Sequence, residues 1–220
     1  MLRGLFVTGT DTNVGKTAVA AALMLRYREL GTLKYWKPIQ TGIEEDDDTA
    51  TVQSLGCLKS EVLAPGIRLR RPLAPYLAAQ LKGTRITIPD LKACLAEEPE
   101  SARWVAEGAG GVLVPINDLE FMTDLMIQLG MPVLVVARTT LGTINHTLMT
   151  LEVLRNRALN IAGVVMVGEP NPGNCDAIQR YGRVEVVGEM PLFPNLTPEA
   201  LAGWATLDFD PKGNLASCFA

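Results

Sequence analysis

The feature that most constrains the fold of this chain is the segment at residues 9–17, which reads Gly-Thr-Asp-Thr-Asn-Val-Gly-Lys-Thr. A short apolar run precedes it and an alanine-rich stretch of helical period follows it, which is the strand–loop–helix setting of a phosphate-binding loop. Gly9 and Gly15, with five residues between them rather than the usual four, let backbone N–H groups close on phosphates. Lys16 supplies a positive charge at the β- and γ-phosphates, and Thr17 offers its hydroxyl to Mg²⁺. The segment therefore predicts a nucleoside triphosphate, Mg²⁺ and phosphoryl transfer.

Short apolar runs alternate with longer stretches of helical period along the rest of the chain. The runs are typical of strands that are covered on both faces, and the alternation predicts right-handed crossovers. The expected strands are residues 5–8, 33–38, 104–107, 133–137, 162–167 and 184–188. The expected helices are residues 16–30, 88–96, 118–129, 143–157, 174–181 and 198–204. The fold class is therefore α/β, a P-loop NTPase-like arrangement with a mostly parallel central sheet and helices on both faces.

Three stretches interrupt this alternation without calling for a second domain. Residues 43–48 are acidic and are expected to form a loop, and residues 61–80 carry three prolines and are expected to be an irregular surface excursion. The tail, residues 207–220, is expected to be able to fray. With 220 residues, 48% of them hydrophobic and 20% charged, residues 1–220 are expected to form one globular domain.

Charge and cysteine usage exclude several classes of protein. The net charge is −4 and no basic block is present, so a nucleic-acid partner is not expected. The four cysteines stand far apart, which argues against a zinc site and suits a reducing cytoplasm. No apolar stretch approaches the roughly 20 residues of a spanning helix, and the N-terminal apolar run is too short for a signal peptide. We expect a cytoplasmic protein without a membrane partner.

Three further groups carry chemistry. Glu107 opens Glu-Gly-Ala-Gly-Gly at the end of an expected strand, Lys37 ends another, and Asp48 closes an acidic run. In parallel sheets ligands sit at the carboxyl ends of strands, so Glu107 and Lys37 are expected beside the phosphate loop. A carboxylate there can hold Mg²⁺. His146 has no acid or serine spaced to it for catalysis, so a capping or packing role is expected.

Taken in order, these motifs resemble the dethiobiotin synthase family. They are G-T-D-T-x-V-G-K-T, W-K-P-x-x-T-G at residues 36–42, the aspartate loop and E-G-A-G-G. The resemblance extends along essentially the whole chain through RPLAPYLAA at residues 71–79, LGTINHT at 141–147 and GEMP at 188–191. Members of the family use ATP to close a cyclic urea from 7,8-diaminononanoate and CO₂ (or bicarbonate), through a carbamate and a carbamic-phosphoric anhydride, in biotin biosynthesis.

The resemblance implies a role for each matching position. Lys37 and Lys16 are the implied catalytic residues, and Thr17, Asp48 and Glu107 are the implied Mg²⁺ ligands. The implied substrate-binding residues are Thr41, Gly142, Thr143 and Asn145, the last three at a helix start that a partner subunit contributes in a homodimer. The implied nucleotide-binding residues are Asn13, Val14, Gly15, Lys16, Thr17, Ala18, Asp48, Glu107, Gly108, Ala109, Gly110, Val167, Gly168, Pro191, Leu192 and Phe193.

The chain departs from the family pattern at Asn13, often acidic, at Tyr76, often histidine, and at Val167–Gly168, where many members place a base-contacting Asn. Loose nucleobase selectivity is therefore expected. Two other functions compete. Partner-switching ATPases of the partitioning or division-site type carry a second lysine where this chain has Asp11. Cobyrinate-type amide synthetases usually carry a glutaminase domain, for which 220 residues are expected to leave no room.

Overall fold

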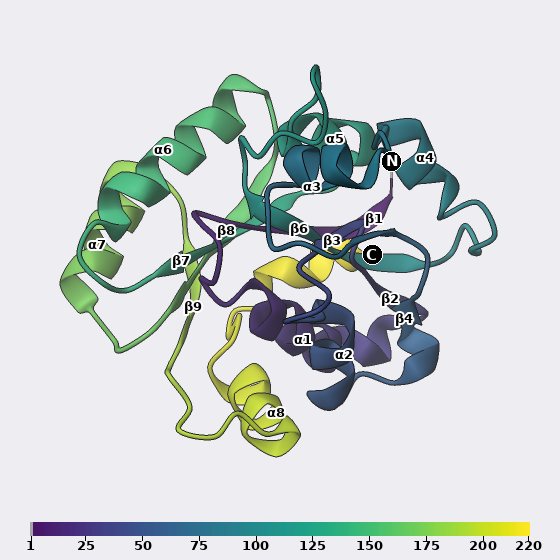
Figure 1. Ribbon diagram of the computed structural model, residues 1–220. Helices are drawn as coiled ribbons and strands as arrows, with labels where there is room; N and C mark the ends of the chain where they lie inside the picture. Colours follow the sequence, from purple (N-terminus) through teal and green to yellow (C-terminus); the bar gives the residue numbers. More distant parts are fainter. Residues whose placement is uncertain (1) are drawn as a thin grey trace.

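A seven-stranded sheet in the order β4-β2-β6-β1-β7-β8-β9 crosses the computed structural model, which describes residues 2–220 (Figure 1). Each neighbouring pair of these strands is parallel, so the prediction of a mostly parallel α/β sheet is confirmed. β3 and β5 form a second, two-stranded parallel sheet. The strands are β1 Arg3–Gly9, β2 Leu33–Trp36, β3 Ile39–Thr41, β4 Val62–Leu63, β5 Ile67–Leu69, β6 Arg103–Gly111, β7 Val133–Arg138, β8 Ile161–Val167 and β9 Val186–Met190.

Helices cover both faces of the large sheet. They are α1 Lys16–Tyr27, α2 Asp48–Ser54, α3 Pro75–Lys82, α4 Ile88–Ala93, α5 Met122–Leu129, α6 Thr143–Asn156, α7 Pro172–Gly182 and α8 Pro198–Leu207, with short 3₁₀ helices at Arg28–Leu30, Lys59–Glu61 and Asn214–Phe219. Alternate residues of β1 enter two separate cores. Phe6 packs with residues of α3 to α7, whereas Leu5 and Val7 pack with α1, α2 and α8. None of the helices within residues 2–220 has the length and apolar character needed to cross a membrane.

The proline-rich excursion contains regular structure, whereas the acidic run forms a loop as expected through Asp47. The proline-rich residues 61–80 were expected to be irregular, but they hold β4, β5 and most of α3. Pro75 is the first residue of α3, where its missing N–H costs nothing. The acidic run ends in α2, because the Asp47 carboxylate accepts hydrogen bonds from the N–H groups of Thr49 and Ala50 and so caps the helix.

The helix expected at 118–129 begins later, at Met122. The Asn117 side chain accepts the N–H groups of Leu119 and Glu120, which holds residues 117–120 in a turn. The Asp124 carboxylate then accepts the N–H of Phe121 at the helix start. These local side-chain bonds compete with the first turn of the helix that the apolar periodicity predicted.

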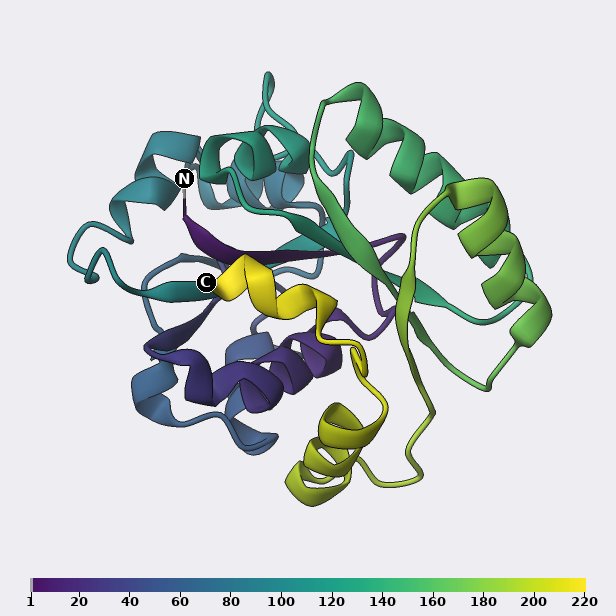
Figure 2. The same cartoon turned by 180° about the vertical axis from the view of Figure 1, so that it is seen from behind.

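The expectation that residues 207–220 fray is wrong. The Phe219 ring is 1% exposed and stacks on Tyr27 of α1, with 4.9 Å between the ring centroids. Asp210, also 1% exposed, accepts hydrogen bonds from the Tyr27 hydroxyl and from the N–H groups of Asn214 and Leu215. Figure 2 shows this segment in yellow against the sheet, on the side of α1. The tail is thus part of the second core.

Candidate active site

The predicted phosphate loop joins β1 to the start of α1. Gly15 has φ 96°, and a β-carbon there would lie 3.0 Å from a methyl group of Val167, so glycine is required by both backbone and space. No side chain within residues 2–220 caps α1, which leaves the first N–H groups of that helix available to an anion. The Lys16 Nζ donates to the Asp11 carbonyl at 2.9 Å. Burial, followed by the charge of Lys37, lowers the pKa of Lys16 to about 8.

Glu107 lies on β6, where it pairs in register with Val7 of β1. Its side chain is buried and takes three contacts. Oε1 lies 2.8 Å from the Lys37 Nζ and 3.0 Å from the Thr17 Oγ1, and Oε2 accepts the Tyr35 hydroxyl at 2.9 Å. The contact of Tyr35 with Glu107 was not predicted, because nothing in the sequence distinguishes Tyr35 from the other residues of an apolar strand. Burial and then the charge of Glu107 raise the pKa of Tyr35, so the phenol stays a donor.

Asp48, the first residue of α2, completes the group. Its Oδ2 lies 2.5 Å from the Lys37 Nζ and its Oδ1 lies 2.8 Å from the Thr17 Oγ1. Burial alone would raise the pKa of Asp48, but the Lys37 ammonium outweighs it and lowers that pKa. Burial would likewise lower the pKa of Lys37, and the charges of Glu107 and Asp48 raise it instead. Lys37 is therefore an ammonium held between two carboxylates, with its third contact at the Gly108 carbonyl, 3.0 Å away.

A cavity of about 650 Å³ opens beside this group. Its wall joins the phosphate loop to β3, the segment before α2, the start of α3 and the end of β6. Predicted residues that line it are Asn13, Gly15, Lys16, Thr17, Ala18, Lys37, Thr41, Asp48, Glu107, Ala109 and Gly110. Others that line it were not predicted: they include Gln40, Glu45, Asp46, Leu73, Leu55 and Leu196. No motif marks these positions, because the wall forms only when segments that are distant in the sequence fold onto one another.

The residues predicted at the nucleobase do not line that cavity. Val167 ends β8 and faces Gly15, and Gly168 follows with φ 143° against the Thr139 side chain. Pro191, Leu192 and Phe193 follow β9 outside the lining, and Leu192 is largely exposed. The apolar Leu55 and Leu196 do line the cavity. The predicted roles of Val167, Gly168, Pro191, Leu192 and Phe193 at the nucleobase stay predictions.

The predicted substrate-binding helix start also lies apart from the cavity. Gly142, φ 93°, precedes α6, and no side chain within residues 2–220 caps that helix. The Thr143 hydroxyl donates to the Arg138 carbonyl at 2.5 Å and borders a separate hollow of about 50 Å³. Asn145 is exposed, and Leu141 is fully exposed. Within one chain, this helix start and Lys37 do not share a binding space.

The residues around Thr17 fit a Mg²⁺ ion. They offer one hydroxyl and two carboxylates, all hard oxygen donors, beside a loop that binds phosphate. Within residues 2–220 no group of three or more His, Cys, Asp and Glu side chains gathers as an all-protein metal cage. Mg²⁺ typically binds through one or two carboxylates together with substrate phosphates and water, so Asp48, Glu107 and Thr17 suit it.

Comparison with known proteins gives a consistent picture. Residues 3–200 match a family described as an AAA domain. A protein of Paramagnetospirillum magneticum named ATP-dependent dethiobiotin synthetase BioD is 46% identical, over 97% of this chain and 100% of its own length. The protein of the same name from Agrobacterium fabrum is 42% identical over 89% of each chain. A ParA family ATPase from Chlorobium tepidum shares the fold, with a TM-score of 0.58, 10% identity and coverage of 93% and 98%.

Proposed function

Since this chain belongs to the ATP-dependent dethiobiotin synthetase family, we propose that it closes the cyclic urea of dethiobiotin from 7,8-diaminononanoate, CO₂ and ATP. The chain is thus an ATP-dependent ligase of biotin biosynthesis. The observation that carries the proposal is the buried contact of Lys37 with both Asp48 and Glu107 beside the phosphate loop. It supports a site in which a positive group stands between the nucleotide and a second substrate in the adjoining cavity.

The proposed reaction has three steps. CO₂ adds to one amine, and a proton is lost, to give a carbamate. A carbamate oxygen attacks the γ-phosphorus of ATP, and ADP leaves. The second amine then attacks the carbamate carbon and displaces phosphate, which closes the ring with loss of a proton. Most of the catalysis in such a transfer is positioning and charge stabilisation.

The residues supply these two contributions in our proposal. The phosphate loop and Lys16 bind and orient the triphosphate. Lys37, whose ammonium is fixed by two carboxylates, faces the negative charge of the carbamate and of the γ-phosphate. Thr17, Asp48 and Glu107 would hold Mg²⁺, which when bound would neutralise charge on the phosphate oxygens. Thr41, from β3, offers a hydroxyl to the amine substrate in the same cavity.

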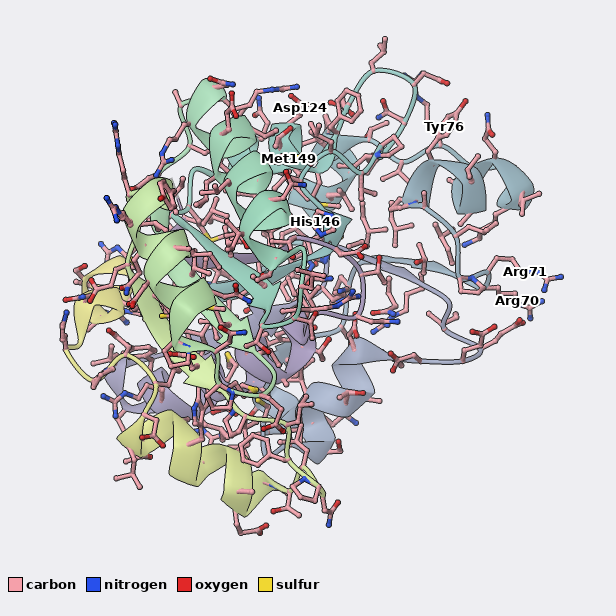
Figure 3. All side chains as sticks on the ribbon, turned by 90° about the vertical axis from the view of Figure 1, so that its left-hand side faces the viewer. Arg70, Arg71, Tyr76, Asp124, His146 and Met149 are labelled. Carbon is pink, nitrogen blue, oxygen red and sulfur yellow. The ribbon has the colours of Figure 1, made fainter. Side chains whose placement is uncertain are left out.

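We further propose a homodimer in which each cavity receives the α6 start of the partner. The support is that Gly142, Thr143 and Asn145 lie outside the large cavity of their own chain, and that an uncapped helix N-terminus attracts a carboxylate. The fully exposed Leu141 and the half-exposed Met149 give this region an apolar surface. Figure 3 shows His146 and Met149 along α6, and Arg70 and Arg71 at the far edge of the molecule.

The experiment that tests the function measures phosphate release from ATP with and without diaminononanoate and bicarbonate. We expect release to depend on both additions, and we expect mass spectrometry to detect dethiobiotin. A partner-switching ATPase would release phosphate without the diamine, and that result would contradict the proposal.

Asp48→Asn and Glu107→Gln should each raise the Mg²⁺ concentration needed for half-maximal rate, since each removes one anionic oxygen. An unchanged Mg²⁺ titration would exclude that residue as a ligand.

Mixing two inactive variants tests the dimer. Lys37→Gln and Asn145→Asp are expected to be inactive for different reasons, the second because its new charge repels the substrate carboxylate. If the sites are shared between subunits, equal amounts mixed after mild dissociation regain about a quarter of wild-type activity, because half the dimers hold one intact site. Activity that does not rise above that of the separate variants would contradict a shared site.

A further inference from the structure

The side chain of Gln40 is a buried amide that the proposed mechanism does not yet use. It lies on β3, three positions after Lys37, is 4% exposed and lines the large cavity. A buried polar atom without a partner is costly, by about 1–3 kcal/mol, so such atoms are rare and call for an explanation. The Gln40 Oε1 is one of these, because it has no hydrogen-bond partner among residues 2–220.

The orientation of this amide is determined by its surroundings. Its Nε2 donates to the Thr41 carbonyl at 3.1 Å and to the Asp46 carbonyl at 3.3 Å. Turning the amide over would place its oxygen against two carbonyl oxygens, none of which can donate. The amide nitrogen is thus committed to the protein, and the buried oxygen is left as an unpaired hydrogen-bond acceptor on a residue that lines the cavity.

The neighbouring wall favours a cationic donor. Glu45 and Asp46, exposed and lining the same cavity, follow Gln40 in the turn before α2. Both acids and the amide oxygen can only accept hydrogen bonds. The apolar Ile39 and Leu73 also line the cavity. A ligand with an ammonium or amine group on an alkyl chain matches both surfaces, whereas a phosphate or carboxylate would be repelled by the acids.

We propose that Gln40 is a specificity-determining residue, whose Oε1 accepts an N–H from one amine of the diamine substrate. This inference rests on the function proposed above and adds a residue to it. The two ends of the amide then have separate tasks. The nitrogen holds the turn at Asp46 in place, and the oxygen selects an amine over groups that cannot donate.

Two substitutions separate these tasks. Gln40→Met keeps the length of the side chain but removes both the donor and the acceptor. Gln40→Glu keeps the acceptor oxygens but removes the donor, and sets a negative charge against the carbonyls of Thr41 and Asp46. Gln53→Met, at an exposed position of α2, is the matched control. For each protein we would measure the melting temperature and the KM values for ATP and for diaminononanoate at saturating Mg²⁺.

We expect the melting temperature to fall in both Gln40 variants, because both lose the donor. The KM for the diamine should rise about tenfold or more in Gln40→Met and stay within about twofold in Gln40→Glu, because a hydrogen bond to a charged group is lost only in the first. The KM for ATP should change little in either. An equal rise of the diamine KM in both variants, or no rise in either, overturns the inference. If the wild-type protein needs no diamine to release phosphate, the proposed function fails instead.

Discussion

Replacing Lys37 with methionine should destabilise the ligand-free protein more than a typical loss of a surface charge. The Lys37 ammonium is 2.5 Å from Asp48 and 2.8 Å from Glu107, and the side chains are 4%, 15% and 0% exposed. Methionine fills nearly the same volume, so the change removes a charge from a packed site rather than opening a cavity. It leaves two buried carboxylates next to each other without the ammonium that contacts both.

The magnitude follows from this geometry. Removing one partner of a buried ion pair typically costs about 3–5 kcal/mol, because the remaining charge stays buried and unpaired. We expect the lower end, since Thr17 and Tyr35 still donate hydrogen bonds to the carboxylates. For a chain of 220 residues, about 3 kcal/mol corresponds to a fall in melting temperature of roughly 6–12 °C.

Mg²⁺ should restore part of this loss. The carboxylates that Lys37 neutralises are the proposed Mg²⁺ ligands, so the ion can take over the charge balance that the ammonium provided. We would follow thermal unfolding of both proteins while titrating MgCl₂, with NaCl at equal ionic strength as the salt control. The melting temperature of Lys37→Met should rise more than that of the wild type, while its synthetase activity stays low.

Lys212→Met is the matched control. Lys212 also forms a 2.7 Å ion pair, with Glu185, but its side chain is 73% exposed. Exposed pairs contribute little, so its melting temperature should change by no more than about 1–2 °C and should respond to Mg²⁺ as the wild type does. The reasoning is wrong if Lys37→Met has the melting temperature of the wild type. It is also wrong if Mg²⁺ raises the melting temperatures of the wild type and of Lys37→Met equally, because the carboxylates are then not left unpaired.

Three further outcomes are expected. Lys16→Ala should lower turnover by about 10²–10³, since one electrostatic contact at the phosphates is lost, and a steady-state rate above about a third of wild type would contradict the loop assignment. Because Val167 and Gly168 offer no side-chain amide, kcat/KM should favour ATP over GTP and CTP only several-fold, and a preference above about a hundredfold would refute this. Phe219→Ala should lower the free energy of unfolding by about 3–5 kcal/mol in urea titrations, whereas the control Phe121→Ala, at an exposed ring, should cost less than about 1 kcal/mol, and equal losses would count against a structural tail.

The sequence by itself determined the features that depend on residues close to one another along the chain. Six apolar runs with helical stretches between them defined the parallel sheet, because strand and helix periods are local properties. The glycines and Gly-Lys-Thr of residues 9–17 defined the phosphate loop for the same reason. The motifs in their order identified the family, which the relatives confirm. The function followed from that identification more than from any single residue.

Local patterns failed where a distant segment decides the conformation. The tail at Asn214–Phe219 is a short 3₁₀ helix, and only its contacts with the Tyr27 ring and the Asp210 carboxylate show why it is ordered. The excursion at residues 61–80 reads as irregular because of its prolines, yet pairing of β4 with β2 and of β5 with β3 makes strands within it. Such pairings depend on tertiary contacts that are worth more than local propensity.

Only the tertiary structure decided which charges meet. Thr17 and Glu107 are 90 positions apart, and Lys37 and Glu107 are 70 apart, yet all three touch. The sheet order places β6 between β1 and β2, so side chains at the ends of these strands converge. The unpaired oxygen of Gln40 likewise depends on the tertiary structure. The amide is oriented by the Thr41 and Asp46 carbonyls, which accept hydrogen bonds from its nitrogen, and the Asp46 carbonyl reaches it only in the folded turn.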